Sequence, residues 1–261
     1  METNHARVRR LFWDIETSPN IGFFWRPGWK VSLPPENIIQ ERAVICICWK
    51  WQGQKKVHHL KWDGGDDIEM ITDFARILES ADEAIAHNGD KFDMGWYNGR
   101  HLIHGLDPIP KTKTVDTYKI AARNFNLNSY KLDYLGKILL GEGKIHAPFQ
   151  LWVDIVINDS KKAMKEMIKY CKKDVVLVEK VWEKLGAYVD PETHAAVMAT
   201  GNVRDRWRCR HCGSDHVKKS KTNVTKAGML NHQMQCLDCG RYYTIANLVF
   251  SWFREAKDAG R

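Results

Sequence analysis

The chain has 261 residues, of which 44% are hydrophobic and 28% are charged. This balance suits a soluble globular protein with one large domain and one small domain. The N-terminal segment is positively charged, but Asp14 and Glu16 interrupt the apolar run that a signal peptide needs, and no apolar run is long enough to span a membrane. Composition therefore argues against a secreted or membrane-embedded protein, and we expect a cytoplasmic location without a membrane partner.

The net charge of +8 is unevenly distributed along the chain. Residues 201–261 contain 12 Lys and Arg against 5 Asp and Glu, a net charge of +7, and residues 1–200 contain the remaining 28 and 27, a net charge of +1. A small basic unit beside a nearly neutral one indicates a polyanionic partner. The alternative is that this charge serves solubility alone.

A buried strand is expected first, in the segment LFWDIETSP at residues 11–19. Successive side chains of a strand point to opposite faces, so Asp14 and Glu16 share one face and Ile15 takes the other. Two carboxylates about 6.6 Å apart in an apolar strand lose hydration and repel each other, which favours a divalent metal as the neutralising group. The alternative is a strand end at which Asp14 caps the next turn and Glu16 is solvated.

Residues 17–42 are expected to be irregular, because prolines interrupt them at positions 19, 27, 34 and 35. Aromatic side chains gather in the same loop, namely Phe23, Phe24, Trp25 and Trp29. Two roles are open for them: stacking on bases beside the carboxylates, or fixing the loop to the core.

A β-hairpin is expected next, because two strand-like runs at 43–51 and 55–62 are joined by a turn at Gln52-Gly53-Gln54. These strands would extend the first strand into an antiparallel set. Cys46 and Cys48 share one face of the first run, and we expect them to be small buried hydrophobic residues rather than reactive thiols.

Residues 66–80 have apolar residues at helical spacing, and residues 84–86 form a short strand. This strand leads into the polar segment HNGDKFD at residues 87–93 and then into a helix that includes Met94 and Trp96. The end of a strand before a helix N-terminus is a common position for functional sites in α/β folds.

A further segment starts at Val115-Asp116-Thr117, followed by helices around Ile120 and over 130–140 and by a Gly- and Pro-containing loop. A long amphipathic helix is expected over about 160–185. Tyr170 and Asp174 are four residues apart on it and therefore share one face, about 6 Å apart along the axis. The alternative is a surface Asp beside a half-buried Tyr.

These segments, in this order, resemble the DEDD superfamily of 3′→5′ exonucleases, which have a ribonuclease H-like fold. The motifs are FWDIET at 12–17, HNGDKFD at 87–93 and YCKKD at 170–174. Residues 114–125 and 129–140 further resemble stand-alone relatives of the proofreading domain of family B DNA polymerases. The resemblance covers about residues 8–186, and Tyr170 after Lys169 fits the tyrosine branch of the superfamily, not the histidine branch.

The resemblance implies four metal-binding carboxylates that hold two Mg²⁺ or Mn²⁺ ions around a scissile phosphate. They are Asp14, Glu16, Asp93 and Asp174. Tyr170 would hydrogen-bond and aim the attacking water, because an unperturbed phenol is too weak an acid to serve as a base at pH 7.

Two residues are candidates for substrate contacts. The resemblance places Thr17 near the 3′ end of the substrate, and the side-chain amide of Asn88 can bond phosphate or sugar. Roles as a strand-end hydroxyl or a turn residue are the alternatives. We expect Asp116 and Asp133 to be helix caps or surface charges rather than metal ligands.

Cys209-x-x-Cys212 and Cys236-x-x-Cys239 supply four thiolates, enough for one tetrahedral, structural Zn²⁺. The segment resembles a zinc ribbon. Three histidines nearby are alternative ligands, namely His211, His216 and His232. The surrounding Lys and Arg, interleaved with aromatic residues, fit contacts to a nucleic-acid backbone and its bases, although a solubilising or protein-binding ribbon is the alternative. We expect a helix within 246–256, docked on the main domain or on a second subunit.

Together these expectations give an α/β protein with a ribonuclease H-like mixed sheet flanked by helices and a small zinc-ribbon domain. The predicted domains are 1–190, a helix or linker at 191–205, in which Asp190 and Pro191 begin a short helix and Gly201 ends it, and 206–261. The predicted activity is 3′→5′ exonucleolytic hydrolysis to nucleoside 5′-monophosphates, on DNA more than RNA. The alternatives are a non-catalytic protein that binds nucleic acid and recruits partners, and an endonuclease.

Overall fold

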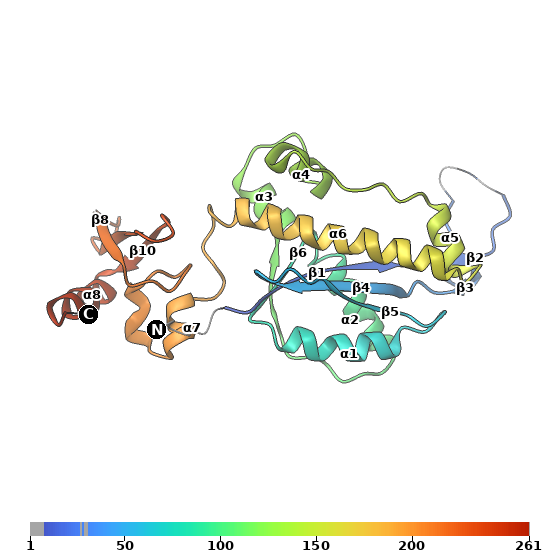
Figure 1. The fold of residues 1–261 in the computed structure, drawn as a ribbon, viewed down its shortest axis with the longest axis horizontal. Helices are drawn as coiled ribbons and strands as arrows, with labels where there is room; N and C mark the ends of the chain where they lie inside the picture. Colours follow the sequence, from blue (N-terminus) through green and yellow to red (C-terminus); the bar gives the residue numbers. More distant parts are fainter. Residues whose placement is uncertain (1–7, 27, 29–30, 261) are drawn as a thin grey trace. The chain divides into compact units, whose positions relative to one another are not determined.

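The computed structural model describes residues 8–26, 28 and 31–260. These residues form two compact units: the first unit is residues 10–184, and the second unit is residues 185–260 with residues 8 and 9. Each unit has its own β-sheet, and the labels of Figure 1 follow both along the chain. None of the helices in the described part of the chain is both long and apolar enough to cross a membrane.

The first unit is built on a five-stranded mixed sheet in the order β5-β4-β1-β6-β7. Its central strand β1 (Arg10–Thr17) pairs antiparallel with β4 (Val44–Trp51) and parallel with β6 (Glu83–Ala86). β5 (His58–Lys61) forms the expected hairpin with β4, and β7 (Lys113–Asp116) runs parallel to β6. The predicted mixed sheet and its antiparallel set are confirmed.

Helices cover both faces of this sheet (Figure 1). The long helix α6 (Lys161–Leu185) lies on one face, and α1 (Ile68–Glu79) and α2 (Asp93–Ile103) lie on the other. Three shorter α-helices also belong to this unit: α3 (Thr117–Asn124), α4 (Leu132–Leu140) and α5 (Gln150–Val156). The long helix expected over 160–185 is confirmed, whereas α5 was not predicted.

The pleat of β1 separates an aromatic core from a polar site. Trp13 points toward α1 and α2, where its ring lies 5.3 Å from that of Phe74 and 6.2 Å from that of Tyr97. Such pairs of buried aromatic rings add stability beyond the area that they bury. Asp14 points to the opposite face, where its Oδ2 lies 3.4 Å from Sγ of Cys171 on α6.

In the loop that follows β1, the residues that the structure describes form only short elements: β2 (Ile21–Gly22), the 3-10 helix η1 (Pro35–Asn37) and β3 (Ile38–Gln40). Phe23, Phe24 and Trp25 are 71%, 56% and 102% exposed. Of the two roles open for these aromatic residues, fixing the loop to the core is therefore wrong for these three. Pro27 and Trp29 lie outside the described residues.

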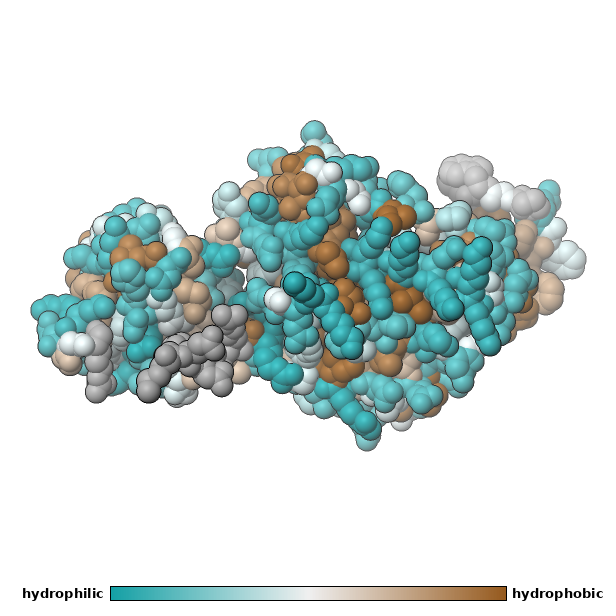
Figure 2. Space-filling model, in the orientation of Figure 1, coloured by the Kyte–Doolittle hydropathy of each residue, from teal (hydrophilic) through white to brown (hydrophobic). Residues whose placement is uncertain are grey.

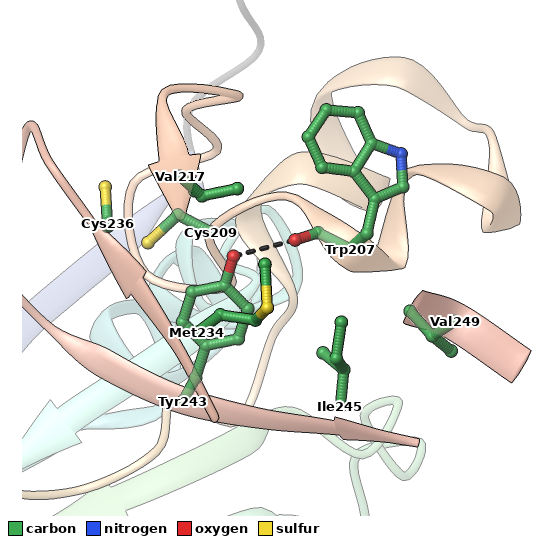
Figure 3. Close-up of a cluster of buried hydrophobic side chains, with 8 residues drawn as sticks. All are labelled: Trp207, Cys209, Val217, Met234, Cys236, Tyr243, Ile245 and Val249. Carbon is green, nitrogen blue, oxygen red and sulfur yellow. Dashed lines mark hydrogen bonds between the residues drawn. The ribbon is translucent and has the colours of Figure 1, made fainter. Parts of the chain in front are cut away.

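The second unit is built on a three-stranded antiparallel sheet in the order β10-β9-β8, formed by β10 (Tyr242–Ala246), β9 (Leu230–Cys236) and β8 (Val217–Val224). Its helical elements are α7 (Ala195–Thr200), the 3-10 helix η2 (Val203–Trp207) and α8 (Asn247–Asp258). The hydroxyl of Tyr243 donates a hydrogen bond to the carbonyl of Trp207 at 2.7 Å in the core of this unit (Figure 3). Phe250, Trp252 and Phe253 of α8 pack against the same core, so the apolar face of α8 contacts the core of its own unit.

The start of α7 differs from the prediction. Asp190 and Pro191 do not begin the helix; His194 is its N-cap, and the carboxylate of Asp190 instead lies 3.0 Å from Nη1 of Arg210. Gly201 ends the helix as expected, in the left-handed conformation with φ 66°.

Hydrophilic side chains cover most of the face shown in Figure 2, with apolar side chains in small separate groups.

Candidate active site

Three carboxylates converge on the face of the first sheet that α6 covers. Asp14 and Glu16 come from alternate positions of β1, and Asp174 comes from α6. One oxygen of each lies within 4.8 Å of the other two. The set consists only of carboxylate oxygens, which are the ligands that Mg²⁺ and Mn²⁺ prefer.

Asp93 lies next to this group, and its side chain is hydrogen-bonded to the backbone of β1. Its Oδ1 accepts a hydrogen bond of 3.0 Å from the N–H of Ile15. That N–H is open to a side chain because β6 pairs with β1 only as far as Phe12 and ends at Ala86. Asp93 is not a member of the 4.8 Å group, but its charge raises the pKa of Asp14, so the two carboxylates are electrostatic neighbours.

Burial raises the pKa of all four carboxyl groups, and loss of hydration is the largest cause for each. The pKa of Asp93 rises to about 7. The pKa of Asp14 lies well above its ordinary value, because repulsion from Asp93, Asp174 and Glu16 adds to desolvation. A bound divalent cation would reverse these shifts, so the electrostatics of the site fit a hard metal ion.

A lysine that the sequence analysis did not single out also lies in the site. Nζ of Lys144 is 2.7 Å from Oδ2 of Asp174 and 5.4 Å from the ring centre of Tyr170. Burial lowers the pKa of Lys144, but the charges of Asp174 and Asp14 outweigh that effect and raise it. Lys144 is therefore a permanent cation beside the carboxylates.

The position of Lys144 depends on the loop between α4 and α5. Its backbone N–H donates to Oδ1 of Asp133 at 2.8 Å, and Asp133 also pairs with Lys137 at 2.6 Å. The run Gly141-Glu142-Gly143 before Lys144 is a local signal of a turn. Asp133 is therefore a support for Lys144, a role that neither expected alternative included.

Tyr170 lies one helical turn before Asp174 on α6. Burial raises the pKa of its phenol to about 12, and the charge of Asp174 acts in the same direction. The hydroxyl therefore stays protonated near neutral pH and is suited to hydrogen-bond a water molecule rather than to remove its proton.

Thr17 is the last residue of β1 and is buried. Its carbonyl accepts a hydrogen bond of 3.1 Å from Nε1 of Trp152 on α5. The ring of Trp152 is nearly parallel to that of Phe149, with 6.5 Å between the ring centres, and Phe149 is 68% exposed. The half-buried Trp152 thus links the exposed ring of Phe149 to the strand end that carries Thr17.

Asn88 adopts a left-handed conformation with φ 60°, which asparagine tolerates better than most residues. Its N–H donates to Oδ1 of Asp116 at 2.9 Å. Asp116 also accepts from the N–H of Tyr118 as the N-cap of α3, so the expected cap is confirmed. Asp116 is only 5% exposed, so it is not a surface charge.

The second unit contains a group of four cysteines whose Sγ atoms all lie within 4.8 Å of one another: Cys209, Cys212, Cys236 and Cys239. Cys209 and Cys239 are 3.6 Å apart at sulfur, and so are Cys212 and Cys236. Four sulfurs bound about 2.3 Å from one Zn²⁺ would be about 3.8 Å apart, so the set fits a tetrahedral zinc ion. Figure 3 shows two of the four cysteines, Cys209 and Cys236, with their sulfur atoms in yellow.

The three nearby histidines make other contacts. Nδ1 of His211 lies 3.1 Å from Nη1 of Arg241, and Nδ1 of His216 lies 2.9 Å from Oδ1 of Asp238. The two ring nitrogens of His232 lie 3.1 Å from Oγ1 of Thr222 and 3.0 Å from Oδ1 of Asn247. None of them joins the sulfur group among the residues that the structure describes.

Comparison with known proteins identifies the class. Residues 40–186, more than half of the chain, match the family model of the RNase H superfamily, and the chain belongs to that superfamily. The matched range includes Asp93, Tyr170 and Asp174 and begins after β1. No curated protein matches the chain.

Among solved structures, the chain is similar to the family B DNA polymerase from the hyperthermophilic archaeon Pyrobaculum calidifontis. The TM-score is 0.54 at 15% sequence identity, and the match covers 84% of this chain and 31% of the polymerase. The similarity concerns the fold, and this chain corresponds to about a third of the polymerase.

Proposed function

We propose that this protein is a metal-dependent 3′→5′ exonuclease of the DEDD type that releases nucleoside 5′-monophosphates from nucleic acid, with DNA favoured over RNA. The observation that carries the proposal is the oxygen-only group of Asp14, Glu16 and Asp174, with Asp93 and the protonated Tyr170 beside it. Membership of the RNase H superfamily supports nuclease chemistry.

Each residue of the site has its own proposed role in cleavage. The four carboxylates would hold Mg²⁺ or Mn²⁺, which supplies neutralisation of the scissile phosphate and an activated water. Tyr170 donates its hydroxyl proton in a hydrogen bond and so orients the nucleophile. Lys144 offsets negative charge at Asp174. Thr17 and Asn88 would contact the 3′ nucleotide, and the exposed ring of Phe149 would stack on its base.

The second unit would act as a zinc ribbon that binds the nucleic-acid backbone. Its four cysteines leave no open coordination position, so a bound Zn²⁺ would hold the unit folded and take no part in cleavage. Three lysines of β8 are exposed and could contact the phosphates of a nucleic-acid backbone: Lys218, Lys219 and Lys221.

The proposal is tested with a 5′-labelled DNA strand in Mg²⁺ or Mn²⁺. Wild-type protein should shorten the strand from its 3′ end, and Asp174→Asn should reduce the rate by at least about 10³-fold, because one neutral amide replaces an ionised metal ligand. Asp73→Asn, an exposed acid on α1, is the matched control and should leave the rate unchanged. Activity that persists in EDTA would refute a metal-dependent nuclease, and tight binding without nucleotide release in any divalent ion would favour the non-catalytic alternative.

A further inference from the structure

A second group of metal-binding side chains lies beside the carboxylates and has no part in the proposed nuclease chemistry. The Sγ atoms of Cys46, Cys48 and Cys171 all lie within 4.8 Å of one another. All three residues have 0% exposure. The expectation that Cys46 and Cys48 are buried is confirmed, but they do not simply fill an apolar core, because a third thiol faces them.

The strand register explains why the thiols meet. Asp14 lies opposite Cys48, and Glu16 lies opposite Cys46, in the antiparallel pair β1–β4. Directly opposed residues point to the same face, so two carboxylates and two thiols form a block on the face that α6 covers. α6 adds Cys171, whose Sγ lies 3.4 Å from Oδ2 of Asp14, so the two groups are in contact.

The three sulfur atoms favour a particular type of metal ion. Three thiolates bound about 2.3 Å from one planar, three-coordinate ion would be about 4.0 Å apart, which fits within the observed limit of 4.8 Å. Structural zinc requires a fourth ligand, and no further His, Cys, Asp or Glu of the described chain joins this group. Thiolates are soft ligands and favour Cu⁺ over the hard ions that suit carboxylates.

We propose that Cys46, Cys48 and Cys171 form a buried three-sulfur site for one soft, thiophilic cation of the Cu⁺ type. The site is distinct from the carboxylate group and from the four-cysteine centre. The proposal does not depend on nuclease activity. Binding would displace the thiol protons to solvent and would replace the contact between Cys171 and Asp14, so the site lies where Asp14 would sense its occupancy.

The test uses the full chain with zinc in the four-cysteine centre, titrated without oxygen with Cu⁺ held by a competing chelator. A chromophoric zinc chelator reports any Cu⁺ that enters the four-cysteine centre, because it would release zinc. Wild-type protein is expected to bind one Cu⁺ per chain before zinc is released. Long incubation allows the buried site to load. Cys48→Ala and Cys171→Ala should lose this first equivalent and keep their zinc.

Ile47→Val is the control, because Ile47 is buried on the opposite face of β4 and the change leaves all three thiols in place. It should retain the first equivalent. If the alanine variants do not fold, X-ray absorption of copper-loaded wild type decides, and three sulfur neighbours are expected. Zinc release from the first addition of Cu⁺, retention of the first equivalent by folded Cys171→Ala, or fewer than three sulfur neighbours would each overturn the proposal.

Discussion

The ionisation of Asp93 gives the metal-free protein an unusual pH dependence. Its pKa is raised from 3.8 to about 7 in the folded state, so between these values the folded state binds more protons than the unfolded state. The free energy of unfolding should therefore fall as pH rises through this window, by about 1 kcal/mol per pH unit for one such group. The raised pKa values of Asp14, Glu16 and Asp174 act in the same direction.

The measurement is urea unfolding in chelator at pH 5 and at pH 7. Stability should be lower at pH 7, and Asp93→Asn should reduce the difference because the amide does not ionise. Saturating Mn²⁺ should remove the loss, since bound metal favours the ionised carboxylates. Greater stability of the metal-free wild type at pH 7 than at pH 5 would contradict this account of the site.

Lys144 should matter for both stability and rate, because it is the cation next to the carboxylates. Lys144→Met keeps the side-chain length and removes the charge, so the rate of cleavage in saturating metal should fall about 10²-fold, as for loss of one electrostatic contact to developing charge. The variant should also be less stable than wild type in chelator at pH 8, where the carboxylates ionise without a counter-charge. Lys162→Met, exposed on α6, is the control. Equal rates for the two variants would leave Lys144 with no role in cleavage.

At the level of elements, the packing of α4 fixes the loop that presents Lys144. A Cβ at Gly136 would collide with the carbonyl oxygen of Glu142 and lie 3.0 Å from Cδ1 of Leu177. Gly136→Ala should therefore shift the turn at Glu142, lower the free energy of unfolding by about 1–3 kcal/mol and reduce cleavage.

The control is Gly99→Ala in α2, where a Cβ would meet no atom within 4 Å. This variant should be more stable by about 0.5–1 kcal/mol, because alanine favours a helix over glycine. Denaturant unfolding and cleavage rates of both variants give the comparison. A Gly136→Ala protein as stable and active as Gly99→Ala would show that the turn tolerates displacement.

Elements with a clear local period could be predicted, and those without one could not. An apolar run that leads into Asp14 marks β1, and the apolar stripe of α6 repeats over many turns, so both were expected from the sequence. α5 has seven residues, fewer than two full periods, directly after a loop rich in Gly and Pro. Asp190 and Pro191 have the chemistry of a helix start, but tertiary contact with Arg210 engages Asp190 outside the helix.

The same distinction applies to the sites. Asp14, Glu16 and Asp174 belong to patterned elements and to recognisable motifs, so their grouping could be anticipated. Lys144 could not be found, because its position depends on how a loop folds against α6. The meeting of Cys171 with Cys46 and Cys48 likewise depends on which part of α6 lies over β4, and no local pattern encodes that register.

For the whole molecule, the uneven charge of the two units would separate the proposed cleavage from the proposed binding of nucleic acid. The second unit holds most of the net charge, and β8 exposes three of its lysines along one strand. Such a strand would contribute counterion release on binding a polyanion but no chemistry. The two functions should therefore respond to different substitutions within one intact chain.

Replacement of Lys218, Lys219 and Lys221 by Gln should weaken binding of single-stranded DNA and reduce the slope of log K against log salt by about 2, because each phosphate contact contributes about 0.7. Cleavage at saturating DNA should be unchanged, since these lysines lie in the second unit and the carboxylates in the first. The control carries the same charge change in the first unit, at the exposed Lys161, Lys162 and Lys165. Fluorescence anisotropy over a range of salt concentrations measures both slopes. If the β8 variant keeps the wild-type slope, this strand does not contact the phosphates, and the positive charge of the second unit serves some other purpose.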